Sequence, residues 1–207
     1  MLSALMLAAT LTGTPPDPLA GAIEQYRAVT SYSVTIHSMH ADGEENIRYY
    51  YKKPGFVRME FIRPHAGAVL IYNPHTRKVR LWPFGVKHFP ELDLSPDNPL
   101  IGNSRGQRVD RSDVGVLLEN ARALRDGGKL DSSGPDIIAG RKAVYFAVTG
   151  AGNFEIGGVH RYELWLDPES LFPLRVVSRD LRNAVIETVT MDAAKINTAL
   201  PDSLFNP

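Results

Sequence analysis

The sequence predicts a mainly antiparallel β protein, a curled sheet of about ten strands with two short helices covering its inner face. Short runs rich in aromatic and β-branched residues recur along the chain, and proline or glycine separates them at intervals of about ten residues. Only two segments carry apolar residues at helical spacing. Because strands seldom alternate with helices, the pattern argues against a parallel α/β sheet.

The composition narrows the class of protein further. The chain has 207 residues, of which 43% are hydrophobic and 22% charged. These fractions are ordinary for a globular protein and exclude a disordered chain, a collagen and a multi-span membrane protein. Lys and Arg together number 23, as do Asp and Glu, so no basic excess points to a nucleic-acid partner. The absence of Cys excludes disulfides, thiolate metal sites and cysteine nucleophiles.

The N-terminus resembles a targeting segment. Residues 2–11 are almost wholly apolar and are followed by a stretch that contains two prolines. An apolar run of about ten residues is too short to span a bilayer but fits the central region of a secretory signal. We therefore expect residues 1–14 to be a signal peptide and residues 15–207 to form a single exported domain. The alternative is a buried N-terminal helix.

Two amphipathic helices are expected, over residues 17–29 and 112–124. In the first, Leu19, Ile23 and Tyr26 share one face. Ser112 or Asp113 can cap the second helix, which two glycines end. The apolar face of the second helix comprises Val114, Leu117, Leu118, Ala121 and Leu124.

Proline positions help to delimit the strands. Pro54, Pro64, Pro74 and Pro83 mark turns or strand ends, because proline cannot occupy a central strand. Residues 83–111 hold further prolines and no clear period, which predicts a long loop. The expected strands are residues 31–39, 46–52, 56–62, 68–73, 78–82, 129–138, 142–149, 159–167, 174–178 and 184–191.

Charge is distributed unevenly between the two halves of the expected sheet. Residues 44–82 contain eight Lys or Arg and three Asp or Glu, whereas residues 131–207 contain seven and ten. A solvated outer face explains this difference most simply. The alternative is a basic docking surface for an acidic partner or a lipid headgroup.

No catalytic motif occurs in a suitable context. Residues 102–106 match the G-x-S-x-G pattern around Ser104, but a proline-rich loop precedes it and no apolar helix follows at once. His37 and His40 are three residues apart, which places them on opposite faces of a strand and prevents them from sharing a metal ion. We therefore expect no enzyme activity, no cofactor and no metal site.

An apolar surplus is concentrated in three consecutive strands, within residues 56–84. Strand alternation places Val57, Met59 and Phe61 on one face, with Arg58 and Glu60 on the other. Two short helices can cover only part of the inner face of a curled sheet. The remainder must be packed by side chains, as in a plain sheet-on-helix core, or filled by an apolar ligand.

Several segments resemble the LolA-like family of periplasmic carriers of outer-membrane lipoproteins. Residues 51–61, with Lys53-Pro54, are similar to a strand of that family, and the next strand ends in a similar Tyr-Asn-Pro turn at residues 72–74. Residues 162–167 and 172–175 resemble its L-W-x-D and L-P-x-R hairpin. Residues 192–205 resemble its C-terminal strand and tail. In order and spacing the resemblance covers about residues 17–207.

The resemblance implies a half-open antiparallel β-barrel whose helices form a lid over a cavity for acyl chains. In the carriers an arginine before the proline holds the lid through helix carbonyls. Lys53 occupies that position here. A lysine retains the positive charge of the arginine but lacks the planar, forked guanidinium group. The residues expected to line the cavity are Val57, Met59, Phe61, Val69, Ile71, Leu81, Trp82 and Trp165.

The function implied is a periplasmic carrier that binds acyl chains of lipoproteins or lipids and moves them between membranes. Its partners would be those acyl chains and a membrane-anchored donor or acceptor protein. A periplasmic regulatory sensor of lipidated proteins with the same fold is the alternative, because one fold serves several functions. A serine hydrolase that uses Ser104 is a third hypothesis.

The first prediction concerns Ser104. We expect the protein to hydrolyse p-nitrophenyl acyl esters no faster than background, because Ser104 lacks the strand-turn-helix context that activates a nucleophile. The measurement compares the parent with Ser104→Ala. Turnover that disappears in Ser104→Ala would contradict the prediction and favour the hydrolase hypothesis.

Overall fold

One antiparallel sheet dominates the computed structural model, which describes residues 17–102 and 108–207. The expected signal segment and Ser104 lie outside the described residues. Within them, eleven strands join in the order β6-β5-β4-β3-β2-β1-β11-β10-β9-β8-β7. The strands are β1 Ser31–His40, β2 Gly43–Lys52, β3 Phe56–Arg63, β4 Val69–Asn73, β5 Lys78–Trp82, β6 Leu92–Leu94, β7 Lys129–Ile138, β8 Arg141–Thr149, β9 Arg161–Leu166, β10 Pro173–Arg179 and β11 Val185–Ile196.

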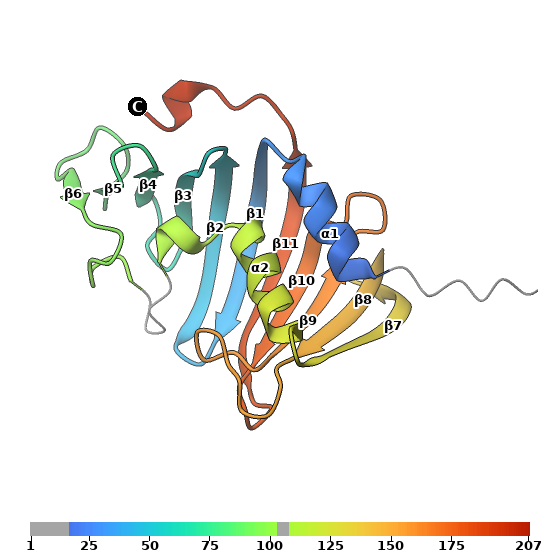
Figure 1. Cartoon of the computed structure of the whole chain (residues 1–207). Helices are drawn as coiled ribbons and strands as arrows, with labels where there is room; N and C mark the ends of the chain where they lie inside the picture. Colours follow the sequence, from blue (N-terminus) through green and yellow to red (C-terminus); the bar gives the residue numbers. More distant parts are fainter. Residues whose placement is uncertain (1–16, 103–107) are drawn as a thin grey trace, which may run out of the picture.

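The strand order consists of two meanders that meet in the middle of the sheet. Strands β1 to β6 form one meander and β7 to β11 the other, and the antiparallel pairing of β1 with β11 joins them. Strands β6 and β7 are the two edges, so the sheet is curled but not closed (Figure 1). This architecture confirms the expected half-open, mainly antiparallel fold.

Both helices lie on the same side of the sheet (Figure 1). Helix α1, Pro18–Arg27, begins where a side-chain oxygen of Asp17 accepts from the backbone N–H groups of Leu19 and Ala20, each at 3.1 Å. Helix α2, Val114–Arg125, is capped in the same way by Asp113. A capping carboxylate satisfies N–H groups that the helix itself leaves without partners. The helices pack against each other and against β8, and α2 also contacts β7.

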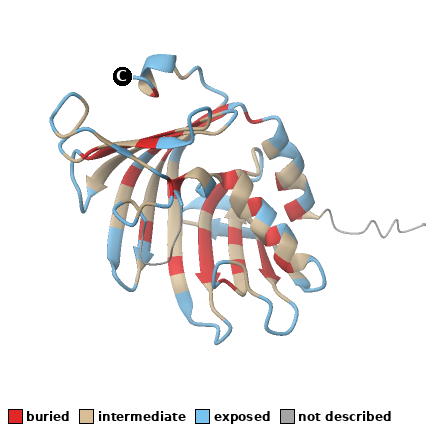
Figure 2. Cartoon of the chain, turned by 60° about the vertical axis from the view of Figure 1, so that its left-hand side comes forward, coloured by how far each residue is buried: buried red, intermediate tan, exposed pale blue. Residues whose placement is uncertain are grey.

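The main core fills the space between the helices and the sheet. In Figure 2 buried residues recur along the central strands and on both helices. Phe146, Leu164 and Leu166 of β8 and β9 are fully buried there, as are Leu19 of α1 and Leu124 of α2. The apolar faces expected for the two helices therefore point into one common core.

A second, smaller core lies on the outer face of the sheet. Val69, Ile71 and Trp82 pack there against Phe205, which belongs to the segment after β11. That segment contains the short 3-10 helix η2, Asp202–Leu204, and crosses the side of the sheet opposite to the helices. Strands β3 to β5 are therefore covered by apolar contacts on both faces.

Both helices and the strands agree with the sequence-based expectations to within a few residues at each end. The exception is the segment expected to be a long loop. It contains β6, which pairs with β5, and a second 3-10 helix, η1 at Val109–Arg111. Strand β6 has only three residues and follows a proline, so its sequence carries too little periodicity to reveal it.

Candidate functional site

The candidate site is the inner face of the sheet on its β3–β6 side. Both helices make their main sheet contacts on β7 and β8, in the other half of the sheet. On the β3–β6 side, four inner apolar side chains are only partly buried, although they pack against the main core. They are Met59, Phe61, Leu81 and Leu94.

Four of the eight residues expected to line the cavity lie on this inner face. Val57 is buried in the main core, and Met59, Phe61 and Leu81 pack beside it. Strand register explains the grouping, because Met59 lies opposite Leu70 and Leu70 opposite Leu81. Directly paired residues of neighbouring strands share one face of a sheet.

The other four residues lie on the outer face, and the prediction that they line the same cavity needs correction. Val69 is paired with Trp82, and both belong, with Ile71, to the small outer core. Strand β4 is buried on both faces, so its sequence is a continuous apolar run that conceals which residues point inward. Its inward residues are Leu70 and Tyr72.

Trp165 also points outward, because its neighbours Leu164 and Leu166 fill the main core. Its ring lies 4.8 Å from that of Tyr145, and the Arg175 guanidinium lies 5.3 Å from its centre. The indole Nε1 donates to Asp136 at 2.8 Å. Trp165 is therefore part of a polar and aromatic cluster on the outer face of β7–β10.

A group of tyrosines, which the sequence analysis did not single out, joins the helices to the inner face of the sheet. The ring of Tyr32 stacks on those of Tyr49 and Tyr51, with centroids 5.9 and 5.1 Å away. Tyr26 of α1 lies 6.5 Å from Tyr32 and 6.4 Å from Tyr51. Three consecutive tyrosines in β2 were visible in the sequence, but their partners on β1 and α1 were not.

The hydroxyls of these tyrosines meet the first turn of α2. Tyr26 donates to Asp113 at 2.9 Å, and the backbone N–H of Val114 donates to the Tyr32 oxygen at 3.2 Å. Burial raises the pKa of Tyr32 well above its ordinary value, and burial, with the nearby Asp113 carboxylate, also raises the pKa of Tyr26. The phenols therefore stay neutral and remain available as hydrogen-bond donors.

Gly115 permits the close approach of α1 to the start of α2. A Cβ atom at Gly115 would lie 2.5 Å from Cε1 of Tyr26, which is too close for any other residue without movement of the ring. At the same place, Asp113 caps α2 and also accepts the hydrogen bond from Tyr26. The contact fixes the two helices to each other at this end.

Two further polar contacts hold α1. The Lys53 ammonium donates to the carbonyl of Arg27, the last residue of α1, at 2.6 Å. A cation is favourable at this end of a helix, where the carbonyls carry partial negative charge. At the other end of α1, the Asp17 carboxylate forms an ion pair with Arg125 of α2. Helix α1 is thus attached to the sheet and to α2 by a small number of polar contacts.

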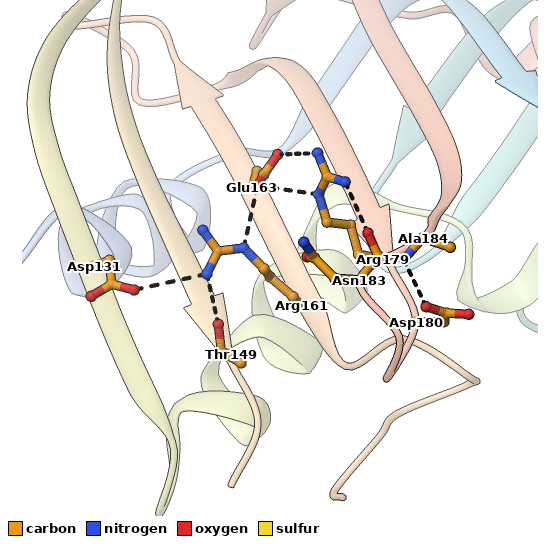
Figure 3. Close-up of polar contacts among 8 residues, drawn as sticks. All are labelled: Asp131, Thr149, Arg161, Glu163, Arg179, Asp180, Asn183 and Ala184. Atoms are coloured by element: carbon orange, nitrogen blue, oxygen red, sulfur yellow. Dashed lines mark hydrogen bonds and ion pairs between the residues drawn. The ribbon is translucent and has the colours of Figure 1, made fainter. Parts of the chain in front are cut away.

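A polar pocket of about 420 Å³ lies elsewhere, on the outer face where β8, β9 and β10 meet the turn before β11. Figure 3 shows Glu163 between the guanidinium groups of Arg161 and Arg179. Arg179 donates to both Glu163 oxygens, at 3.2 and 3.3 Å, and Arg161 donates to one of them at 3.2 Å. Arg161 also donates to Thr149 at 2.9 Å. Two cations are therefore held on one carboxylate across β9 and β10.

The described residues include no group of three or more His, Cys, Asp or Glu side chains that could hold a metal ion. His37 and His40 lie apart, as the strand spacing predicts. His37 faces Asp192 of β11 at 3.7 Å, and His40 faces Asp42 of the following turn at 3.9 Å.

The second prediction concerns Glu163. Glu163→Gln should lower the free energy of unfolding by about 1–3 kcal/mol, because it leaves two neighbouring guanidinium groups without a shared anion. Urea unfolding followed by circular dichroism measures the change. Arg182→Gln is the matched control, since Arg182 is exposed and lies 3.7 Å from its partner Asp180. Equal stability of parent and Glu163→Gln would show that the network does not stabilise the sheet.

Comparison with known proteins supports the fold. No protein-family model matches the sequence, and no curated protein matches it. Among solved structures, an uncharacterised conserved protein from Thermus thermophilus is 14% identical, covers 91% of both chains and has a TM-score of 0.56. The lipoprotein LppX of Mycobacterium tuberculosis is 12% identical, with a TM-score of 0.54 over 91% of this chain and 99% of LppX.

MucB, in a complex with MucA, is 18% identical with a TM-score of 0.51, and the match covers 90% of this chain and 56% of MucB. This chain therefore spans about half the length of MucB. At these identities the likenesses concern the fold alone. The chain shares its fold with these structures, in agreement with the half-open antiparallel sheet that the sequence resemblance implied. In the described residues, no helix is both long enough and apolar enough to cross a membrane.

Proposed function

We propose that the protein is an exported binder of acyl chains that carries lipoproteins or lipids between the membranes that bound the periplasm. The observation that supports this proposal is the partly buried apolar surface of Met59, Phe61, Leu81 and Leu94, on the inner face beside two helices. Removing an acyl chain from water gains about 0.8 kcal/mol for each buried methylene. An open sheet edge next to this surface would let a long chain enter.

The attachment of the helices suits a carrier that must also release its ligand. Helix α1 is held by Lys53, by the ion pair of Asp17 with Arg125, and by the hydrogen bond from Tyr26 to Asp113. Moving α1 would break these few polar contacts and expose Leu19 and Ala22, a local opening that costs less than unfolding of the whole sheet. An acyl chain would then extend the apolar core from Val57 toward the helices.

No catalytic role is part of this proposal, and no cofactor or metal ion is needed for it. The binding step uses apolar burial alone, and the polar contacts of α1 would regulate release of the ligand.

Native mass spectrometry of protein purified from membranes tests the proposal directly. A co-purified lipid or lipoprotein supports it, whereas protein that stays free of lipid and binds no acyl probe contradicts it.

A regulatory sensor of lipidated proteins is the second candidate. It is favoured by the likeness of the fold to MucB, whose solved structure contains a second protein, MucA. A carrier should transfer a bound acyl probe to acceptor vesicles, whereas a sensor should retain the probe and change its affinity for a protein partner. Vesicle transfer therefore separates the two candidates.

The third prediction places the ligand against Phe61. Phe61→Glu should weaken binding of a fluorescent fatty-acyl probe at least about tenfold, because the carboxylate would have to be buried beside the chain without a partner. Phe89→Glu is the matched control, since Phe89 is 92% exposed. If Phe61→Glu remains folded by circular dichroism and binds the probe as tightly as the parent, Phe61 does not contact the ligand.

The fourth prediction concerns Lys53 as a latch. Its hydrogen bond to Arg27 stabilises the closed, ligand-free position of α1 and so competes with the bound ligand. Lys53→Leu should therefore slow release of an acyl probe to vesicles without preventing uptake. Lys53→Arg should release the probe at the parent rate or somewhat faster. Because the contact is exposed, Lys53→Leu should change stability by only about 1 kcal/mol or less.

Stopped-flow fluorescence measures the three release rates. Identical rates for parent, Lys53→Leu and Lys53→Arg would show that Lys53 is a solvated charge at a strand end and has no part in release.

A further inference from the structure

The segment that follows β11 occupies a distinct site on the outer face of the sheet. We call residues 199–207 the tail, and the surface beneath it the tail site. The tail runs from the end of β11 toward the β3–β5 part of the sheet (Figure 1), and its contacts with the small outer core place it on the face opposite the helices. Its anchor is Phe205, which is 3% exposed and packs against Val69, Ile71 and Trp82. The ring of Phe56 lies 5.7 Å from that of Phe205.

Three cations of the sheet hold the tail around this anchor. Lys52 donates to the carbonyl of Leu200 at 3.2 Å and to the Asp202 carboxylate at 2.6 Å. Arg58 donates to the carbonyl of Leu204 at 2.8 Å. Arg80 donates to the carbonyl of Phe205 at 3.3 Å. These cations lie on β2, β3 and β5, in the part of the sequence with the basic surplus.

Most of these contacts are to the main chain and are independent of the tail sequence. Arg58, Arg80 and one bond of Lys52 all reach backbone carbonyls, which any extended peptide would present. Among the tail side chains, Leu200 and Leu204 pack beside the small outer core, and Asn206 accepts a hydrogen bond from Arg80 at 3.1 Å. The contacts that involve a charge pair or full burial are those of the Asp202 carboxylate and the Phe205 ring. Both are complementary to the surface, because an ammonium faces the acid and an apolar cluster packs against the ring.

The tail is attached to the sheet at its root, and Phe205 is the only buried residue within it. Its root is fixed, since Asn197 accepts from the backbone N–H of Thr30 at 2.7 Å and Ser31 donates to the carbonyl of Thr198 at 2.7 Å. Beyond this root, the Asp202 side chain is 95% exposed, and η2 contains no buried residue. Loss of the tail would uncover Val69, Ile71 and Trp82, an apolar cluster with cations beside it.

We propose that the tail site is a docking site for a partner protein that presents an exposed peptide with a carboxylate three residues before an aromatic ring. The chain's own tail has this spacing in Asp202 and Phe205. It occupies the site within the same molecule and so competes with the partner peptide. The partner displaces the tail and places its own acid on Lys52 and its own ring among the outer-face apolar residues. The site lies on the opposite face from the proposed acyl-binding surface, so both can be occupied together.

The experiment uses the full chain and a fluorescein-labelled peptide of residues 199–207, followed by fluorescence anisotropy. Phe205→Ala releases the tail of the protein, so this variant should bind the peptide at least about tenfold more tightly than the parent. Asp202→Asn changes only an exposed side chain and should produce a smaller increase, which keeps the test valid if Phe205→Ala fails to fold. Arg80→Gln, added to either variant, should weaken peptide binding.

Changes in the peptide test the chemistry of recognition. Replacing the peptide's Asp with Asn, or its Phe with Ala, should weaken binding to the Phe205→Ala protein at least about tenfold. A peptide that keeps only this Asp and Phe in a Gly-Ser background should bind within about tenfold of the original. These results would support a partner with that spacing, whatever its remaining sequence.

Any of four results would overturn the proposal. Equal peptide binding by the parent and by both released-tail variants would exclude competition by the tail. Binding that is insensitive to the peptide's Asp and Phe would exclude the proposed chemistry. Absence of binding by folded Phe205→Ala and Asp202→Asn would show that the tail is a structural clip only. Binding of these variants to anionic vesicles without peptide binding would assign the site to a membrane surface instead.

Discussion

The pairing of β1 with β11 is the constraint on which the rest of the architecture depends. It joins two meanders whose internal pairings are between strands adjacent in sequence, and it brings together segments about 150 residues apart. Because the two free edges, β6 and β7, then lie at opposite ends of the sheet, the curl of the sheet leaves one inner face open between them. The same pairing fixes the start of the C-terminal segment beside the end of α1, where Asn197 holds Thr30.

The helices cover this inner face unequally, and their polar contacts explain where they sit. Asp113 caps α2 and accepts from Tyr26, while Tyr32 receives the first helical N–H group, so the start of α2 is fixed over the stacked tyrosines of β1 and β2. From there α2 extends over β7 and β8. The β3–β6 side consequently keeps apolar side chains that are only partly buried. That surface is the physical basis of the proposed acyl binding, and the Lys53 contact with α1 is the basis of its proposed control.

The two faces of the β3–β5 region differ in how completely their apolar side chains are covered. On the inner face, Met59, Phe61 and Leu81 remain partly accessible beside the main core. On the outer face, Phe205 closes over Val69, Ile71 and Trp82, and the basic side chains around them hold the tail. Three of the eight basic side chains of residues 44–82, those of Lys52, Arg58 and Arg80, contact this one short segment, so part of the basic surplus has a local explanation.

The sequence by itself determined the class of fold, because strand alternation, proline spacing and helix caps are local signals. It placed both helices and ten of the eleven strands to within a few residues. It also placed Val57, Met59 and Phe61 together on one face, which is the inner face, since β3 alternates with charged residues. Only the tertiary structure decided the direction of Val69, Ile71, Trp82 and Trp165. Strand β4 is apolar at successive positions, so its period is hidden, and the residue that covers its outer side, Phe205, lies more than 120 residues away. The tyrosine contacts with Asp113 were equally inaccessible, because they depend on how α1, β1, β2 and α2 meet in space and not on spacing within any one segment.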